Sequence, residues 1–225
     1  MASHGGNDPQ LDREIDLDVD AATAAHRRLL AHLDVLVSEG DLAVESPSRL
    51  PGWSRGHVLA HLRQSGDGHL RLLEAAARGE VGVQYPNGVA GRAADIEEGS
   101  ILPMTEQVDL LRASSTVLEA GWIVSDWEGE GDGPAGRVSI ADLPFMRERE
   151  VVVHHIDLDI GYEFDDLPIE YLRLELRRME VLWTARQRSG VTQLPDAALR
   201  TPPPTRLAWL IGRVQIDGLE PAGIF

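Results

Sequence analysis

Apolar residues recur at helical spacing in four segments of the first two thirds of the chain. Ala22, Leu29 and Leu33 fall on one helical face in the first segment, and Leu111 and Leu118 do so in the third. The predicted helices span residues 16–38, 54–78, 105–122 and 139–160. Four helices joined in this order predict a four-helix bundle and a fold that is mainly α.

Caps and helix breakers mark the ends of these segments. Gly40 follows the first helix as a stop signal, and Ser54 is a good N-cap for the second. Pro144 is tolerated because it falls in the first turn of the fourth helix. Residues 79–103 contain several glycines and are predicted to be mostly loop, with one short helical segment at 92–98.

The last third of the chain has a different pattern. A charged amphipathic helix is predicted at 168–189, followed by a proline-rich link at 201–205 and a short helix from Leu207 to Arg213. The segment Val214–Ile216 fits either a strand or a turn. The predicted organisation is a disordered lead-in at 1–10, a four-helix bundle at 11–164 and a small C-terminal unit at 165–225.

Net charge excludes two classes of partner. The formal charge is −16, whereas binding to nucleic acid or to an anionic membrane needs a basic surface. No apolar run approaches the roughly 18 residues of a membrane span, and the polar N-terminus lacks the plan of a signal peptide. We therefore expect a cytoplasmic protein.

Missing residue types limit the chemistry further. The chain contains no cysteine and no lysine. The protein therefore has no thiolate ligand, no cysteine nucleophile and no amine for Schiff-base formation. Any catalytic chemistry must therefore use other side chains or a reagent that the protein binds from solution.

A metal site is the most specific chemistry that the residue spacing indicates. Glu150 and His154 are four residues apart, so a helix places both on one face. A third ligand must come from another helix, and His57 and His61 are equally placed for it because they form an i, i+4 pair themselves. Three protein ligands leave one position of a tetrahedral zinc ion open, as in catalytic sites.

These residues also have an ordinary structural interpretation. A helical histidine is most often half buried and bonded to the backbone, and Glu150 with His154 could form a surface ion pair of little energetic value. The three valines at 151–153 argue against the second interpretation, since a carboxylate in apolar surroundings needs a partner.

Three further residues are candidates for supporting roles. Arg92 lies in a glycine-bearing loop and Arg213 in the last helix, where each could hold a carboxylate through two hydrogen bonds. Asp157 follows His154 by three residues and could orient that ligand, although a solvated aspartate near a helix end is equally consistent with the sequence. Arg147, beside Glu150, is interpreted as solvated or paired.

Four motifs together resemble the mycothiol-dependent maleylpyruvate isomerase family, a branch of the DinB-like metal-binding bundles. The resemblance extends over about residues 10–160 and less clearly over the tail. The motifs are Leu50-Pro-Gly-Trp-Ser-Arg-Gly-His-Val-Leu-Ala-His-Leu62, Tyr85-Pro with Gly91-Arg92-Ala-Ala-Asp-Ile-Glu97, Arg147-Glu-Arg-Glu-Val-Val-Val-His-His-Ile-Asp-Leu158 and Leu207-Ala-Trp-Leu-Ile-Gly-Arg213.

The resemblance implies a DinB-like four-helix bundle in which Zn²⁺ is held by His61 rather than His57, together with Glu150 and His154. It also implies that Arg92 and Arg213 lie near the substrate. Family members usually carry a small α/β unit after the bundle, whereas the short stretch between Ser189 and Thr205 predicts that the sheet is shortened or missing here.

The implied activity is cis–trans isomerisation of maleylpyruvate to fumarylpyruvate, a step of gentisate degradation, with mycothiol as the thiol cosubstrate. A borrowed low-molecular-weight thiol agrees with a chain that lacks cysteine. Two alternatives stay open: a mycothiol S-transferase acting on another electrophile, and a metal-binding bundle without catalytic activity.

Overall fold

The computed structural model describes residues 9–40, 42–187 and 193–223. The chain divides into two compact units, the first ending at Ile160 and the second beginning at Gly161. Most of the predicted lead-in, residues 1–8, lies outside the described residues. The first helix already begins at Pro9, earlier than its apolar period indicated.

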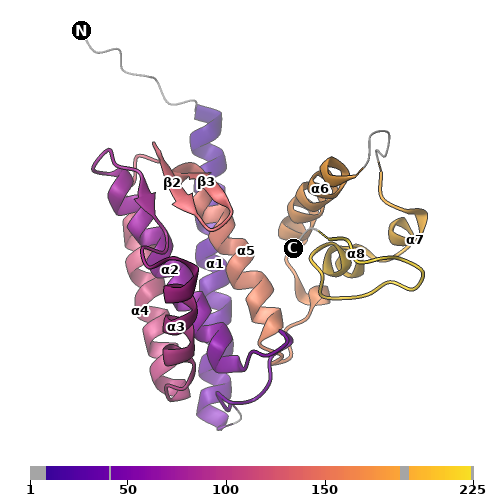
Figure 1. Ribbon diagram of the computed structural model, residues 1–225, viewed down its shortest axis with the longest axis horizontal. Coiled ribbons are helices and arrows are strands. Elements are labelled where there is room, and N and C mark those ends of the chain that lie inside the picture. The colour runs from indigo at the N-terminus through magenta and orange to yellow at the C-terminus, as the bar shows by residue number, and fades with distance from the viewer. Residues whose placement is uncertain (1–8, 41, 188–192, 224–225) are drawn as a thin grey trace. The chain divides into compact units, whose positions relative to one another are not determined.

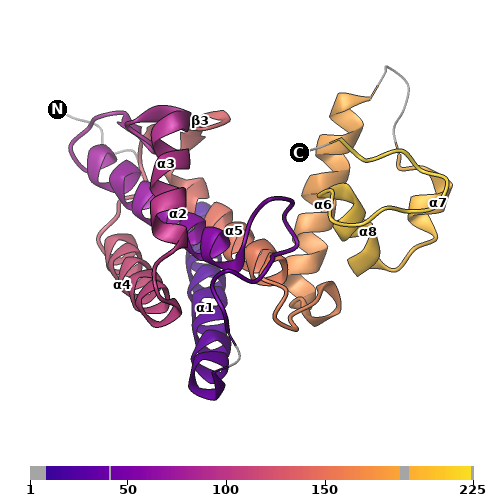
Figure 2. The same ribbon diagram turned by 60° about the horizontal axis from the view of Figure 1, so that its bottom comes forward.

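Four long helices build the first unit, as the sequence predicted (Figure 1). They are α1 (Pro9–Glu39), α2 (Arg55–Ala76), α4 (Met104–Ile123) and α5 (Leu143–Asp157). The most extensive contacts join α1 to α5 and α2 to α4, and further contacts join α1 to α4 and α2 to α5. Figure 2 shows the same helices from a second direction, and their side chains share one core. That core contains Ala22, Leu72, Leu118 and Leu143, one from each helix.

A fifth helix, α3 (Gly88–Ser100), packs against α2. The sequence predicted only a short helical segment at 92–98, because Gly88 and Gly91 weaken the pattern. Gly88 has a positive φ of 66°, a conformation that costs glycine little, and this residue turns the chain into the helix. The longer α3 brings Arg92 alongside α2.

A small sheet also belongs to the first unit, and none of its strands was predicted from the sequence. Its strands are β1 (Gly82–Val83), β2 (Glu130–Gly133) and β3 (Gly136–Ser139), in the order β1-β2-β3. β1 runs parallel to β2, and β2 pairs with β3 as an antiparallel hairpin. Strands this short and this rich in glycine have no alternation of apolar residues to reveal them. A 3₁₀ turn, η1 (Ile140–Asp142), then leads into α5.

The second unit contains η2 (Phe164–Asp166), α6 (Ile169–Arg186), α7 (Asp196–Leu199) and α8 (Pro203–Leu210). α6 packs on α8, and Trp183 and Trp209 meet across that contact with ring centroids 6.4 Å apart. Within residues 161–187 and 193–223 there is no strand, so the sheet is missing from the described part of this unit. No helix among the described residues is both long and apolar enough to span a bilayer.

Candidate metal site

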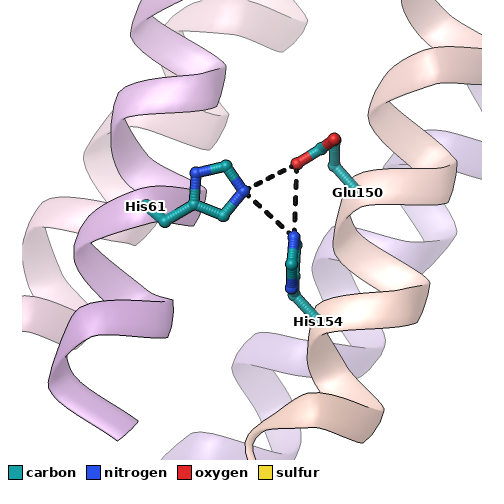
Figure 3. Close-up of side chains that lie close together, drawn as sticks. All are labelled: His61, Glu150 and His154. Atoms are coloured by element: carbon teal, nitrogen blue, oxygen red, sulfur yellow. Dashed lines mark hydrogen bonds and ion pairs between the residues drawn. The ribbon is translucent and has the colours of Figure 1, made fainter. Parts of the chain in front are cut away.

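Three side chains from two helices meet inside the first unit (Figure 3). His61 comes from α2, and Glu150 and His154 come from successive turns of α5. His61 Nε2 lies 2.9 Å from Glu150 Oε2 and 3.0 Å from His154 Nε2, and the remaining separation, His154 Nε2 to Glu150 Oε2, is 3.5 Å. The i, i+4 spacing on α5 therefore aims both side chains at the neighbouring helix.

The donor set fits a metal ion. All three ligand atoms lie within 4.8 Å of one another. Donor atoms at zinc–ligand distances of about 2.0–2.1 Å from a tetrahedral ion are about 3.3 Å apart, and the observed separations of 2.9, 3.0 and 3.5 Å bracket that value. Two imidazole nitrogens and one carboxylate oxygen are the ligands of a catalytic zinc site with one open position.

Burial and mutual contact set the charges of the three groups. Burial alone would raise the pKa of the Glu150 carboxyl, but hydrogen bonds with His154 and His61 outweigh it and hold that pKa well below its ordinary range. Burial lowers the pKa of His61. Burial acts in the same direction on His154, yet Asp157 and Glu150 raise its pKa to about 9. The carboxylate of Glu150 is therefore ionised and available to a cation.

Asp157 supports one of the three residues directly. Its carboxylate is fully buried, and Oδ2 lies 2.9 Å from His154 Nδ1. The contact fixes the ring so that Nε2 faces Glu150 and His61. Metal-binding histidines usually donate their second ring N–H in this way. Of the two interpretations that the sequence left open for Asp157, the structure supports orientation of His154 and excludes a solvated side chain.

His57 points to different partners, which separates it from His61. Its Nδ1 accepts a hydrogen bond from the Ser54 backbone N–H at 3.2 Å, and its Nε2 lies 3.3 Å from Glu97 Oε2. His57 thus belongs to the N-terminal cap of α2 and to its contact with α3. Spacing could not distinguish the two histidines because they share one helix face, whereas the surrounding residues do.

Arg92 contacts the other side of His61. Its Nη2 lies 2.8 Å from His61 Nδ1, and its guanidinium lies over the Tyr85 ring at 5.2 Å from the centroid. A guanidinium can only donate, so Nδ1 accepts this hydrogen bond. Arg213 follows Gly212 in the second unit, where its Nη1 donates to the Ile211 carbonyl at 3.0 Å. A role for Arg213 at the metal site stays a prediction.

Arg147 is the supporting residue that the sequence interpretation missed. It was expected to be solvated or paired, but it is completely buried, and burial lowers its pKa to about 10. Its Nε donates to His26 Nε2 and its Nη1 donates to the Leu62 carbonyl, both at 2.8 Å. Arg147 precedes Glu150 by one turn, and Leu62 follows His61. The guanidinium therefore joins the two helices beside the ligands. Only its position three residues before Glu150 could have indicated this role.

The fold and the three converging side chains define a helical-bundle protein with a candidate metal site of two histidines and one carboxylate. Residues 20–159 match the family model described as the mycothiol maleylpyruvate isomerase N-terminal domain. The chain therefore belongs to the mycothiol maleylpyruvate isomerase family, as its motifs predicted.

Two solved structures share the fold. A crystal structure of the mycothiol-dependent maleylpyruvate isomerase is 24% identical, with 76% of this chain and 72% of that chain covered and a TM-score of 0.69. A crystal structure of a point mutant of the mycothiol-dependent maleylpyruvate isomerase is 21% identical, with 89% and 90% covered and a TM-score of 0.76. No curated protein sequence matches the chain. At these identities the agreement concerns the fold.

Proposed function

We propose that this protein is a zinc- and mycothiol-dependent cis–trans isomerase that converts maleylpyruvate into fumarylpyruvate. The observation that carries the proposal is the convergence of His61, Glu150 and His154 in a chain of this family that has no cysteine. Such a protein offers a place for a thiol but no thiol of its own.

A zinc ion bound by two neutral imidazoles and one carboxylate would supply a positive charge and an open position that lower the pKa of a thiol. The residues around the site support this use. Asp157 and Arg147 hold the ligand-bearing helices and the His154 ring in place, so the donor atoms need little reorganisation.

The reaction needs no oxidant and no net proton. The mycothiol thiolate adds to one carbon of the cis double bond, and the electron pair moves onto the adjacent ketone oxygen to give an enolate. The former double bond is then single and rotates. Collapse of the enolate expels the thiolate and forms the trans double bond, so the thiol is regenerated. A catalyst must therefore hold the carboxylates and stabilise the enolate oxygen.

Arg92 is suited to that task because its guanidinium lies beside His61, borders a cavity and is released from the His61 ring when a metal ion binds. It would bind a substrate carboxylate or the enolate oxygen. We also propose Arg213 for the second carboxylate, because the family resemblance implies that this residue lies near the substrate. Two arginines match a dicarboxylate substrate in charge.

The test is a reconstituted reaction. Full-length protein is loaded with zinc, mixed with mycothiol and maleylpyruvate, and followed by the loss of maleylpyruvate absorbance and by chromatographic detection of fumarylpyruvate. His154→Ala is the matched negative control. Unchanged absorbance with the loaded protein would reject this substrate. A stable thiol adduct would identify a mycothiol S-transferase, and little retained metal after gentle purification would favour a bundle without catalytic activity.

A further inference from the structure

A series of hydrogen bonds passes through all four long helices of the first unit. His26 Nδ1 of α1 lies 2.7 Å from Glu119 Oε1 of α4, and Arg147 Nε of α5 donates to His26 Nε2 at 2.8 Å. Arg147 Nη1 donates to the Leu62 carbonyl of α2, also at 2.8 Å. We call Glu119, His26, Arg147 and the Leu62 carbonyl the buried network. It joins four segments that are far apart in sequence, and it ends beside His61.

The chemistry of the donors and acceptors fixes the direction of these bonds. A guanidinium can only donate, so His26 Nε2 accepts from Arg147. Burial lowers the pKa of His26 to about 4, and the imidazole is therefore neutral near pH 7. Its single proton is on Nδ1 and is donated to the Glu119 carboxylate. The other tautomer would point an N–H at the Arg147 N–H, so Glu119 selects the tautomer that Arg147 requires.

The His26 ring is also held by stacking. It lies nearly parallel to the Trp122 ring, with the planes at 3° and the centroids 5.9 Å apart. Trp122 follows Glu119 by three residues, so both lie on the same face of α4. The side chain of His26 is only 3% exposed. Two residues of α4 therefore hold this ring in the orientation that presents Nε2 to α5.

Arg147 depends on the ring for one of its hydrogen bonds. Its side chain is completely buried, and its Nη2 has no hydrogen-bond partner among the residues that the structure describes. A buried polar group without a partner is costly, and a charged one more so. Without His26 the Nε–H would lose its acceptor as well. The guanidinium would then have to move towards water or another acceptor.

Such a movement would reach the candidate metal site. Arg147 lies one turn before Glu150 on α5, and Leu62 directly follows His61 on α2. The contact between Arg147 and the Leu62 carbonyl therefore fixes the separation of these two helices next to the ligands. A metal site requires its ligand distances to be within about 0.2 Å of the ideal values. Small shifts between α2 and α5 are thus enough to weaken metal binding.

We propose that His26 and Glu119 are positioning residues of the candidate metal site. They hold Arg147 against the Leu62 carbonyl and thereby set the spacing of the helices that carry the ligands. Both act through Arg147 and not through contact with the ion. Glu119 is 32% exposed, so the buried network couples a residue at the surface of α4 to the metal site. The proposal rests on the metal site of the proposed function but not on its substrate.

The test measures metal binding by full-length protein without substrate. Zn²⁺ affinity is measured against a chromophoric chelator, and the visible absorption of bound Co²⁺ reports the geometry of its ligands. His26→Phe keeps a flat ring beside Trp122 but removes both hydrogen bonds. We expect about tenfold weaker zinc binding, the lower end of the range for residues that support metal ligands. We also expect a changed Co²⁺ spectrum.

Glu119→Leu removes only the acceptor of the His26 proton. This side chain is partly exposed, so the variant should fold even if His26→Phe does not. We expect weaker zinc binding and a Co²⁺ spectrum changed in the same direction. Glu119→Gln is the conservative partner, because its amide oxygen can accept from Nδ1–H. It should keep the affinity and the spectrum close to those of the wild type.

Leu118→Ala is the matched control for a general loss of stability. Leu118 is fully buried in the apolar core next to Glu119, and its truncation leaves a cavity without interrupting the buried network. All variants are compared at a temperature at which thermal unfolding shows them to be folded. There Leu118→Ala should bind zinc as tightly as the wild type, with the same Co²⁺ spectrum.

Four results would overturn the proposal. They are no metal binding by the wild type, wild-type affinity and spectrum in Glu119→Leu, an equal loss in Glu119→Gln and Glu119→Leu, or an equal loss in Leu118→Ala. The isomerase assay is a separate measurement. A protein that shows the expected metal binding but leaves maleylpyruvate unchanged would support the positioning role and reject the proposed reaction.

Discussion

Replacing Arg92 by methionine should make the protein bind zinc more tightly. Arg92 Nη2 donates to His61 Nδ1 at 2.8 Å in the structure. A neutral imidazole carries one N–H, so a metal ion on Nε2 leaves that proton on Nδ1. The N–H would then face a guanidinium that can only donate. Metal binding must therefore break the contact between Arg92 and His61.

The size of the effect follows from the contact that is lost. A hydrogen bond from a charged group has a net value of about 1.5–3 kcal/mol. Arg92 is partly exposed, so water replaces some of this energy when the guanidinium moves away. We therefore use the lower limit of this hydrogen-bond energy, about 1.5 kcal/mol. A free-energy difference of about 1.4 kcal/mol corresponds to a tenfold change in an equilibrium constant. We expect zinc affinity to rise about tenfold in Arg92→Met.

Competition with a chromophoric chelator measures this affinity directly. Arg71→Met is the matched control. Arg71 borders the same cavity as Arg92, but its guanidinium donates to the Gln84 carbonyl and not to a candidate ligand. Its zinc affinity should stay close to that of the wild type. Equal or weaker zinc binding by Arg92→Met would refute the competition between the guanidinium and the ion. Under the proposed function the same variant loses isomerase activity, so tighter metal binding and lower turnover should appear together.

Three further predictions concern metal support, packing and acid stability. Asp157→Ala removes the carboxylate that contacts His154, a candidate ligand, and should weaken zinc binding about 10- to 100-fold in the same chelator assay. Gly56→Ala would place a Cβ 2.0 Å from the Ser100 carbonyl oxygen. Thermal unfolding should show a loss of about 1–3 kcal/mol. Gly121→Ala, which meets only flexible leucine ends, should be neutral or stabilising. Burial lowers the pKa of His69 to about 3 from 6.5, so the unfolded state binds its proton first as pH falls below 6.5. The free energy of unfolding therefore falls between about pH 6.5 and pH 3, by about 1.4 kcal/mol per pH unit for one such proton. In urea unfolding of the metal-free protein, His69→Asn should show a shallower dependence of this free energy on pH.

The sequence predicted the parts of this protein that depend on local periodicity. Helical spacing revealed the four long helices, and the i, i+4 pair placed Glu150 and His154 together before any tertiary contact was known. Residue spacing alone could not choose between His57 and His61. That choice depends on neighbours brought by the fold, because one ring bonds Ser54 while the other meets α5.

Other features left no periodic signal. The small sheet consists of strands of two to four residues with several glycines, so no alternation could reveal it. The burial of Gln64 could not be predicted from the sequence either, because a glutamine on a helix is usually solvated. Only the structure shows that both of its amide atoms are buried and have no hydrogen-bond partner among the residues described.

Arg147 shows why the geometry of the metal site could not be obtained from its ligands alone. A buried guanidinium is costly to desolvate, and this one donates to a carbonyl and to His26, whose pKa is lowered to about 4 chiefly by burial and which is therefore neutral near pH 7. The Arg147 contact with the Leu62 carbonyl joins α5 to α2 next to His61. Gly66 leaves room for it, since a Cβ there would lie 3.3 Å from Arg147 Nη2. The separation of the ligand-bearing helices is thus set by a charged side chain and a glycine, two residue types that sequence patterns assign to the surface and to turns.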